Sequence, residues 1–252
     1  MSHSRLAALS LCRRLACVAA LLLPWPIAMA QGPAAPEGKQ DFSAAERLLL
    51  MSDQLHMLKP PTTLNYSYRK SGSLEPGFTD SVNLKLARLP DGKCCQASGD
   101  FLTGKRRTPL PEVEQAQGNP VILFFLERDI REMQRLTKGS TVYFRKRIRL
   151  ALYEAAKVSE ARYTYKGRPV AGHEIVISPY QDDPNRAKFE KYTAKQYVFA
   201  LSDEVPGGVV AIRVQIPAVT GTDVLLEEEL LLAQATLPAR AALQATAPGK
   251  LP

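Results

Sequence analysis

Hydrophobic positions follow a helical spacing in some stretches of the chain and an alternating spacing in most others. In residues 42–58, apolar residues recur every three or four positions, which predicts an amphipathic helix. Ser43 and Glu46 have the spacing of a capping box at its start. Pro60 and Pro61 end it, because proline cannot continue a helix. The apolar stripe comprises Ala44, Leu48, Met51, Leu55 and Leu58.

Residues 62–102 change to a period of two, which is typical of half-buried strands. Leu64, Tyr66 and Tyr68 fall on one face of the first strand. Two further runs follow, each separated from the last by glycine and proline residues. This block predicts three antiparallel strands joined by short turns.

Residues 119–156 form a predicted helical insert after a loop-like stretch over 103–118. The first helix, 120–137, has a buried stripe and two opposed charge pairs on its solvent side. The stripe comprises Leu123, Leu126, Ile130 and Met133, and the pairs are Glu127–Arg131 and Arg128–Glu132. Residues 141–156 fit either a helix or a strand, and the preceding Gly-Ser pair favours the helix.

Residues 160–235 return to strand patterns interrupted by turn residues, and 224–235 fit either a last strand or a short helix. The sequence therefore predicts an α+β fold. Two strand blocks form a curved antiparallel sheet, with an N-terminal helix and an inserted helical pair. One domain over 42–236 accounts for all of these elements.

The first 30 residues have the features of a secretory signal peptide. Arg13 and Arg14 precede an apolar run from Leu15 to Leu23, and Ala28-Met29-Ala30 is an A-x-A cleavage site. We expect residues 31–41 to be a flexible leader and 237–252 a disordered tail. The predicted location is the periplasm of a Gram-negative bacterium, or the medium. Cleavage would leave no transmembrane span.

The net charge of +8 becomes +5 after cleavage, because three arginines and no acids lie in the first 30 residues. That modest charge on an exported chain disfavours nucleic acid as a partner. Two basic runs remain, and we expect a solvated face, with anionic lipid headgroups or an acidic envelope protein as possible partners. The runs comprise Lys105, Arg106, Arg107, Arg145, Lys146, Arg147 and Arg149.

Several chemistries lack their residues after cleavage. Only His56 and His173 remain, neither within a catalytic motif, so a nucleophile–histidine site and a zinc site are disfavoured. We predict no cofactor, no metal and no catalytic residue. The remaining cysteines, Cys94 and Cys95, could form a vicinal disulfide, pair between chains, or be one buried and one exposed thiol.

Carboxylates are the remaining catalytic material, and they occur in pairs. Such pairs serve glycoside hydrolysis when held at set separations. Here they lie in turns, where acidic residues also recur for backbone reasons. A structural role is therefore expected, with a carboxylate-dependent hydrolase as the weakest functional hypothesis. The pairs are Glu75 with Asp80, Asp182 with Asp183, and Asp203 with Glu204.

The order of elements over 42–235 resembles the periplasmic lipoprotein-carrier superfamily of Gram-negative bacteria. The resemblance implies a half-barrel sheet, partly closed by helices, with a hydrophobic concavity for acyl chains. We therefore expect a non-catalytic binding or carrier protein for an apolar or amphipathic ligand. Candidate ligand-binding residues are Tyr66, Tyr68, Tyr163 and Tyr165. The alternative is an adaptor or assembly factor of an envelope complex, acting through the basic helix.

Overall fold

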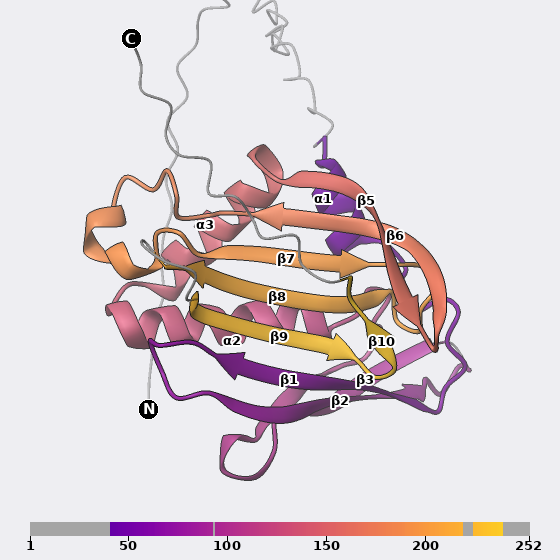
Figure 1. Cartoon of the computed structure of the whole chain (residues 1–252). Coiled ribbons are helices and arrows are strands. Elements are labelled where there is room, and N and C mark those ends of the chain that lie inside the picture. Colours follow the sequence, from indigo (N-terminus) through magenta and orange to yellow (C-terminus); the bar gives the residue numbers. More distant parts are fainter. Residues whose placement is uncertain (1–40, 93, 219–223, 239–252) are drawn as a thin grey trace, which may run out of the picture. The chain divides into compact units, whose positions relative to one another are not determined.

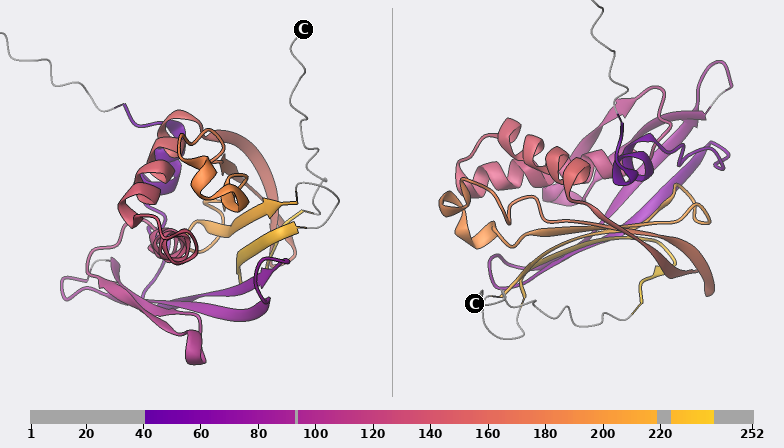
Figure 2. Two further views of the ribbon diagram at one scale, coloured as in Figure 1. Left: turned by 90° about the vertical axis from the view of Figure 1, so that its left-hand side faces the viewer. Right: turned by 90° about the horizontal axis from the view of Figure 1, so that it is seen from above.

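A computed structural model describes residues 41–92, 94–218 and 224–238. One antiparallel sheet of ten strands dominates it, in the order β10-β5-β6-β7-β8-β9-β1-β2-β3-β4. The sheet curves, and helices lie against its concave face (Figures 1 and 2). The predicted α+β fold with a curved antiparallel sheet is confirmed.

The first strand block forms one side of the sheet. Its strands are β1 (Thr62–Ser71), β2 (Phe78–Arg88), β3 (Cys94–Phe101) and β4 (Thr108–Val113). Along β1, Leu64, Tyr66 and Tyr68 are buried, as the period of two predicts. Tyr66 lies opposite Val82 of β2, so the apolar positions of neighbouring strands share one face.

Strand β4 replaces the loop predicted over 103–118. It pairs with β3 and forms an edge of the sheet. Pro109 and Pro111 mask the strand pattern in the sequence. An edge strand tolerates them because one side of its backbone needs no hydrogen-bond donor for a neighbouring strand.

The N-terminal helix is shorter than predicted. The capping box is present, with Glu46 N donating to Ser43 Oγ at 3.1 Å, and opens α1 (Ala44–Glu46). A π-helical stretch (Arg47–Met51) follows, and the helix then ends instead of continuing to residue 58. The chain turns there because Ser52 Oγ donates back to Arg47 O, and Leu55 N donates to Gln117 O.

The helical insert forms two helices. The predicted helix 120–137 is α2 (Val121–Thr137), and the ambiguous segment is α3 (Thr141–Glu154), a helix. In α3, Phe144, Ile148 and Leu152 are buried as predicted, whereas Ala151 replaces Ala155 in the stripe.

Two details of the α2 prediction are wrong. Leu123 is 55% exposed, and the buried face begins instead at Val121 and Ile122. Arg128 points inward and contacts Glu228 of the sheet, so its predicted surface pair with Glu132 does not form. A helix that covers a sheet on one face and a loop on another buries a wider sector than a single stripe indicates.

The second strand block forms the other side of the sheet. Its strands are β5 (Lys157–Tyr165), β6 (Arg168–Ile177), β7 (Gln196–Leu201), β8 (Val209–Pro217), β9 (Val224–Leu232) and β10 (Ala235–Thr236). Segment 224–235 is therefore strand. Strand β9 pairs with β1 and joins the two blocks, and β10 pairs with β5.

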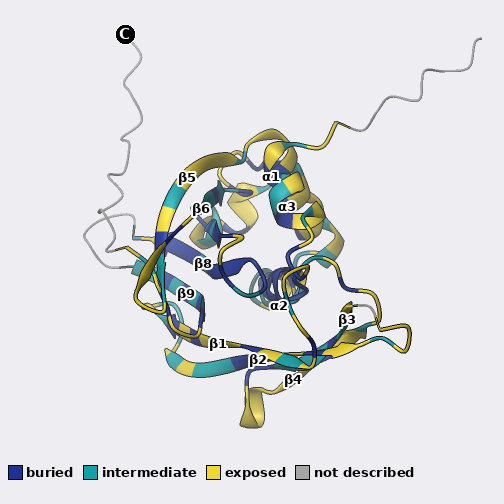
Figure 3. Cartoon of the chain, turned by 90° about the vertical axis from the view of Figure 1, so that its right-hand side faces the viewer, coloured by how far each residue is buried: buried dark blue, intermediate teal, exposed yellow. Residues whose placement is uncertain are grey.

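The core lies between the concave face and the helices (Figure 3). Phe125, Ile130 and Met133 of α2 are buried there, as are Tyr68 and Phe199 of the sheet. All five side chains are at most 2% exposed. This part of the concave face is therefore packed like a protein interior.

The predicted signal peptide (1–30), most of the leader and most of the tail lie outside the described residues. Within the described ranges, no helix is long and apolar enough to cross a membrane.

Candidate functional site

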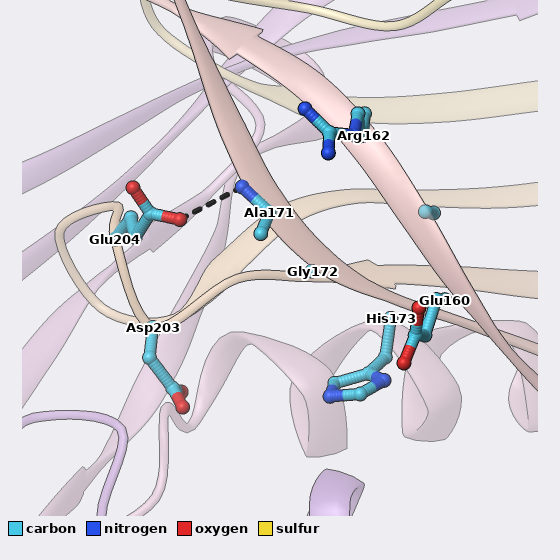
Figure 4. A pocket seen from close by; sticks show the side chains of 8 residues that line it. Glu160, Arg162, Ala171, Gly172, His173, Asp203 and Glu204 are labelled. Atoms are coloured by element: carbon cyan, nitrogen blue, oxygen red, sulfur yellow. Dashed lines mark hydrogen bonds between the residues drawn. The ribbon is translucent and has the colours of Figure 1, made fainter.

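A pocket lies on the concave side of the β5–β6 hairpin, beside the turn that joins β7 to β8 (Figure 4). Its volume is about 670 Å³, which suits a small-molecule ligand. The pocket is lined by Glu160, Ala161, Arg162, Ala171, Gly172, His173, Asp203 and Glu204. We call it the hairpin pocket.

Strand pairing directs the charged side chains into this pocket. Glu160 lies opposite His173, and Arg162 lies opposite Ala171, in the register of β5 with β6. His173 and Ala171 lie two and four positions before the buried Ile175 of β6, so their side chains point to the same, concave face as Ile175. Glu160 and Arg162, their partners on β5, point to that face as well and are exposed to solvent.

The pocket begins where β6 separates from β7. Their pairing ends at His173 and Leu201, just before Gly172. A Cβ atom on Gly172 would lie 2.1 Å from Leu201 O, so the strands approach more closely here than a side chain allows. Past this point the β7–β8 turn takes the place of a neighbouring strand.

Side chains of that turn satisfy the backbone of β6. Ala171 N donates to Glu204 Oε1 at 2.8 Å, and Ser202 Oγ donates to Ala171 O at 2.5 Å. Both bonds replace ladder hydrogen bonds that β7 no longer provides. They hold the two walls of the pocket at a set separation.

The remaining charges in the pocket have no internal partner. Among the described residues, Glu160, Arg162 and Asp203 form no ion pair, and all three are exposed. Figure 4 shows Asp203 and His173 projecting to the same side of the ribbon, with Glu160 beside the imidazole. The described part of the chain holds no group of three side chains suited to a metal ion. The arrangement can recognise a ligand by charge and hydrogen bonding.

A second polar cluster lies beneath α2, and here the charges are paired. Lys70 Nζ lies 2.6 Å from Glu75 Oε2 and 3.3 Å from Glu228 Oε1, and Arg128 Nη1 lies 3.0 Å from Glu228 Oε2. Burial disfavours the charged form of Glu228, but the positive charges of Arg128, Lys195 and Lys70 together outweigh it and lower the pKa of that carboxyl. We call this set the ionic layer.

Asp129, the residue after Arg128 in α2, forms a buried ion pair with Lys195. Asp129 accepts hydrogen bonds from Lys195 Nζ and, at 2.5 Å, from Tyr197 Oη. All three residues are buried. Burial and the adjacent Asp129 charge raise the pKa of Tyr197, so its hydroxyl stays protonated and donates. These contacts fasten α2 to the sheet.

The four tyrosines proposed from the sequence are not brought together. Tyr66 and Tyr68 are at most 1% exposed in the core, on the concave face. Tyr163 and Tyr165 alternate with Glu160 and Arg162, which places them on the opposite face of the hairpin. Their role in ligand binding stays a prediction, and none of the four lines the hairpin pocket.

The two basic runs lie far apart, at opposite sides of the sheet (Figures 2 and 3). Lys105, Arg106 and Arg107 are exposed between β3 and β4, where Arg107 contacts Asp100 at 2.8 Å. The other run belongs to α3.

Two cations of α3 are used within the protein. Arg145 Nε lies 2.7 Å from Glu127 Oε1, and Arg147 Nε lies 2.9 Å from the buried Asp183 carboxylate. Lys146 and Arg149 are exposed and form no ion pair with a described residue.

The remaining candidates from the sequence form bonds within the protein. Cys94 and Cys95 form a vicinal disulfide, one of the three predicted alternatives. Glu75 belongs to the ionic layer, Asp80 accepts from Thr103 Oγ1 at 2.7 Å, and Asp183 is fully buried beside Arg147.

Sequence patterns single out His173, and Asp203 with Glu204 as a pair, but not the other residues of the hairpin pocket. His173, Asp203 and Glu204 were each expected to be structural. The spacing of Glu160 and Arg162 could have indicated this site, because charged residues two positions apart on a strand mark one face as solvated. Only the register of β5 with β6 places these residues at one site.

No protein-family model and no curated protein sequence matches this chain. Several solved structures are similar at low sequence identity. The Mycobacterium tuberculosis lipoprotein LppX has a TM-score of 0.32 at 10% identity, over 78% of this chain and 96% of that one. A LolA superfamily protein from Nitrosomonas europaea has a TM-score of 0.19 at 8% identity, over 78% and 94%.

A chain of the Pseudomonas aeruginosa MucA/MucB complex has a TM-score of 0.33 at 10% identity, over 82% of this chain. The present protein spans 62% of that chain, which is less than two thirds of its length. The expected resemblance to the lipoprotein-carrier superfamily is thus present as a weak similarity of fold. Function must be inferred from this chain's own residues.

Proposed function

We propose that this chain is an exported, non-catalytic binding protein of the bacterial envelope, which holds an amphipathic ligand in the hairpin pocket. One observation carries the proposal. Glu160, Arg162 and Asp203 converge on a pocket of about 670 Å³ without internal ion-pair partners among the described residues. Elsewhere on the concave face, the buried carboxylate of Glu228 is paired with Lys70 and Arg128.

The lining suggests the chemistry of the ligand. Ala171 and the backbone at Gly172 provide small, uncharged surface against which an apolar segment can lie. Three carboxylates against one guanidinium favour a ligand that carries a cationic group, such as an amine. Asp203 and Glu160 are the groups we expect to contact that cation.

Native mass spectrometry of the protein isolated from its own host tests the proposal. We expect a bound small molecule on the wild type and its loss from a Glu160→Gln/Asp203→Asn variant. Asp182→Asn is the matched control, because it makes the same change at an exposed turn residue that does not line the pocket. Repeated preparations without any adduct would count against a binding role. An adduct retained by the double variant would place the ligand elsewhere.

The other two hypotheses receive less support. An adaptor acting through the basic helix loses two of its four cations to Glu127 and Asp183. A hydrolase that depends on the predicted carboxylate pairs loses Glu75 and Asp183 to internal ion pairs. In the third pair, Glu204 is occupied by its hydrogen bond from Ala171 N, which leaves Asp203 without a second available carboxylate of its pair.

A further inference from the structure

A mixed apolar and basic surface covers the outer side of α1 and α3. On α1 and the π-helical stretch, Ala45 and Leu49 point into the core, so the opposite face is exposed. That face carries Phe42, Leu50 and Met51, which are 39%, 43% and 53% exposed. Arg47 lies among them and donates to Phe42 O. Exposed apolar side chains in a group indicate an interaction surface.

The exposed stripe of α3 continues this surface. Lys146, Arg149 and Tyr153 follow one another at steps of three and four, which places them on one face of the helix. All three are exposed, Tyr153 by 55%.

A hydrogen bond joins the two parts. Ser43 Oγ donates to Leu152 O at 2.9 Å, so Phe42 and Tyr153, the adjoining residues, lie at the junction. Figures 2 and 3 show α1 and α3 side by side at the surface of the domain. We call this the α1–α3 face. It comprises Phe42, Arg47, Leu50, Met51, Lys146, Arg149 and Tyr153.

We propose that the α1–α3 face docks on an anionic lipid surface. Helices that lie on membranes combine flexible apolar side chains with lysine or arginine, and tyrosine is enriched at the headgroup level. The charge of the face complements such a surface. Arg47, Lys146, Arg149 and the neighbouring Lys157 are exposed cations, against Asp41 and Glu154 as exposed acids.

The composition of the face favours lipid over a protein partner. Its apolar and cationic side chains are exposed together, and a deformable bilayer can accommodate them without a matching shape. Leu50 and Met51 can enter the headgroup region while Lys146 and Arg149 contact phosphate groups, as in interfacial helices. Docking does not depend on ligand binding in the hairpin pocket, since none of these residues lines it.

Vesicle flotation of the full protein tests this docking. Vesicles that contain phosphatidylglycerol are compared with vesicles of phosphatidylcholine alone. Lys146→Gln/Arg149→Gln removes two cations, each worth about fivefold in affinity near an anionic surface, so we expect binding about 25-fold weaker. Leu50→Ser/Met51→Ser removes the inserted apolar groups, and we expect at least about a tenfold loss. Lys85→Gln, at an exposed site on β2, should bind like the wild type.

The comparison is internal, because every variant keeps the same N-terminal residues. Thermal unfolding checks that the exposed substitutions leave the fold intact. Wild-type protein that fails to float with phosphatidylglycerol vesicles would overturn the proposal. So would equal flotation of the wild type and both double variants. Loss of a crosslinked protein partner, with flotation unchanged, would assign the face to a protein instead.

Discussion

The concave face of the sheet has two regions that treat charge in opposite ways. Beneath α2, Glu228 of β9 is buried and held by cations, and Asp129, which α2 itself contributes, is buried against Lys195. In the hairpin pocket, Glu160 of β5 and Asp203 of the β7–β8 turn are exposed and have no ion-pair partner among the described residues. Both regions belong to one continuous sheet.

The difference shows what the helices do to the sheet. Where α2 covers the strands, water is excluded and a buried charge must be paired to be tolerated. Where the cover ends, the same strand face can carry charges that remain available to a ligand. We therefore expect substitutions beneath α2 to affect stability, and substitutions in the hairpin pocket to affect binding.

The largest effect is expected at the pair of Asp129 and Lys195. Asp129→Ala leaves Lys195 buried without a counter-charge, so the free energy of unfolding should fall by about 3–5 kcal/mol. Urea unfolding of the purified protein measures this loss. The double variant Asp129→Leu/Lys195→Met removes both charges and should recover most of the stability. A single variant that unfolds like the wild type would contradict the paired role.

The ionic layer should make stability depend on acid. The pKa of Glu228 is lowered in the folded protein, so its contribution is present above the pKa of the unfolded state. That contribution is lost as the pH falls through the lower, folded-state pKa. Urea midpoints measured from neutral pH downward should fall in this window for the wild type. Glu228→Gln should be less stable at neutral pH and should fall less steeply, and parallel curves would refute the assignment.

A smaller loss of stability is expected at the buried hydrogen bonds of Asn119. Asn119 Nδ2 donates to Tyr66 Oη at 2.9 Å and to Gly207 O at 2.8 Å. Tyr66→Phe removes one of two acceptors, so unfolding should become easier by about 1 kcal/mol. Thermal unfolding is sufficient to measure this. A loss of several kcal/mol would show that Tyr66 supports more than this bond.

The smallest effect on stability is expected in the hairpin pocket. Glu160→Gln changes an exposed side chain without an ion pair, so the free energy of unfolding should stay within about 0.5 kcal/mol of the wild type. The same variant, combined with Asp203→Asn, should lose the bound molecule in native mass spectrometry. Strong destabilisation by Glu160→Gln would show that the carboxylate is structural, and the contrast between the two regions would then disappear.

Particular residues show how far the sequence could be interpreted. The alternation of Leu64, Tyr66 and Tyr68 correctly predicted a buried strand face, and Ser43 with Glu46 correctly marked the start of α1. The position of Arg128 was predicted wrongly, on the solvent side of α2. The helical spacing of apolar residues cannot distinguish a cation in solvent from one that reaches a buried carboxylate. Strand β4 was missed because its prolines are normally read as loop residues.

Local pattern by itself determined the class of the fold, most of the elements and the face that β1 buries. These properties depend on side-chain spacing along a few consecutive residues. Tertiary structure alone decided that β9 joins the two strand blocks, that α2 brings charges into the core, and that Glu160, His173 and Asp203 line one pocket. The physical reason is distance along the chain, since contacts between residues tens of positions apart follow from strand register and helix packing, which no local pattern encodes.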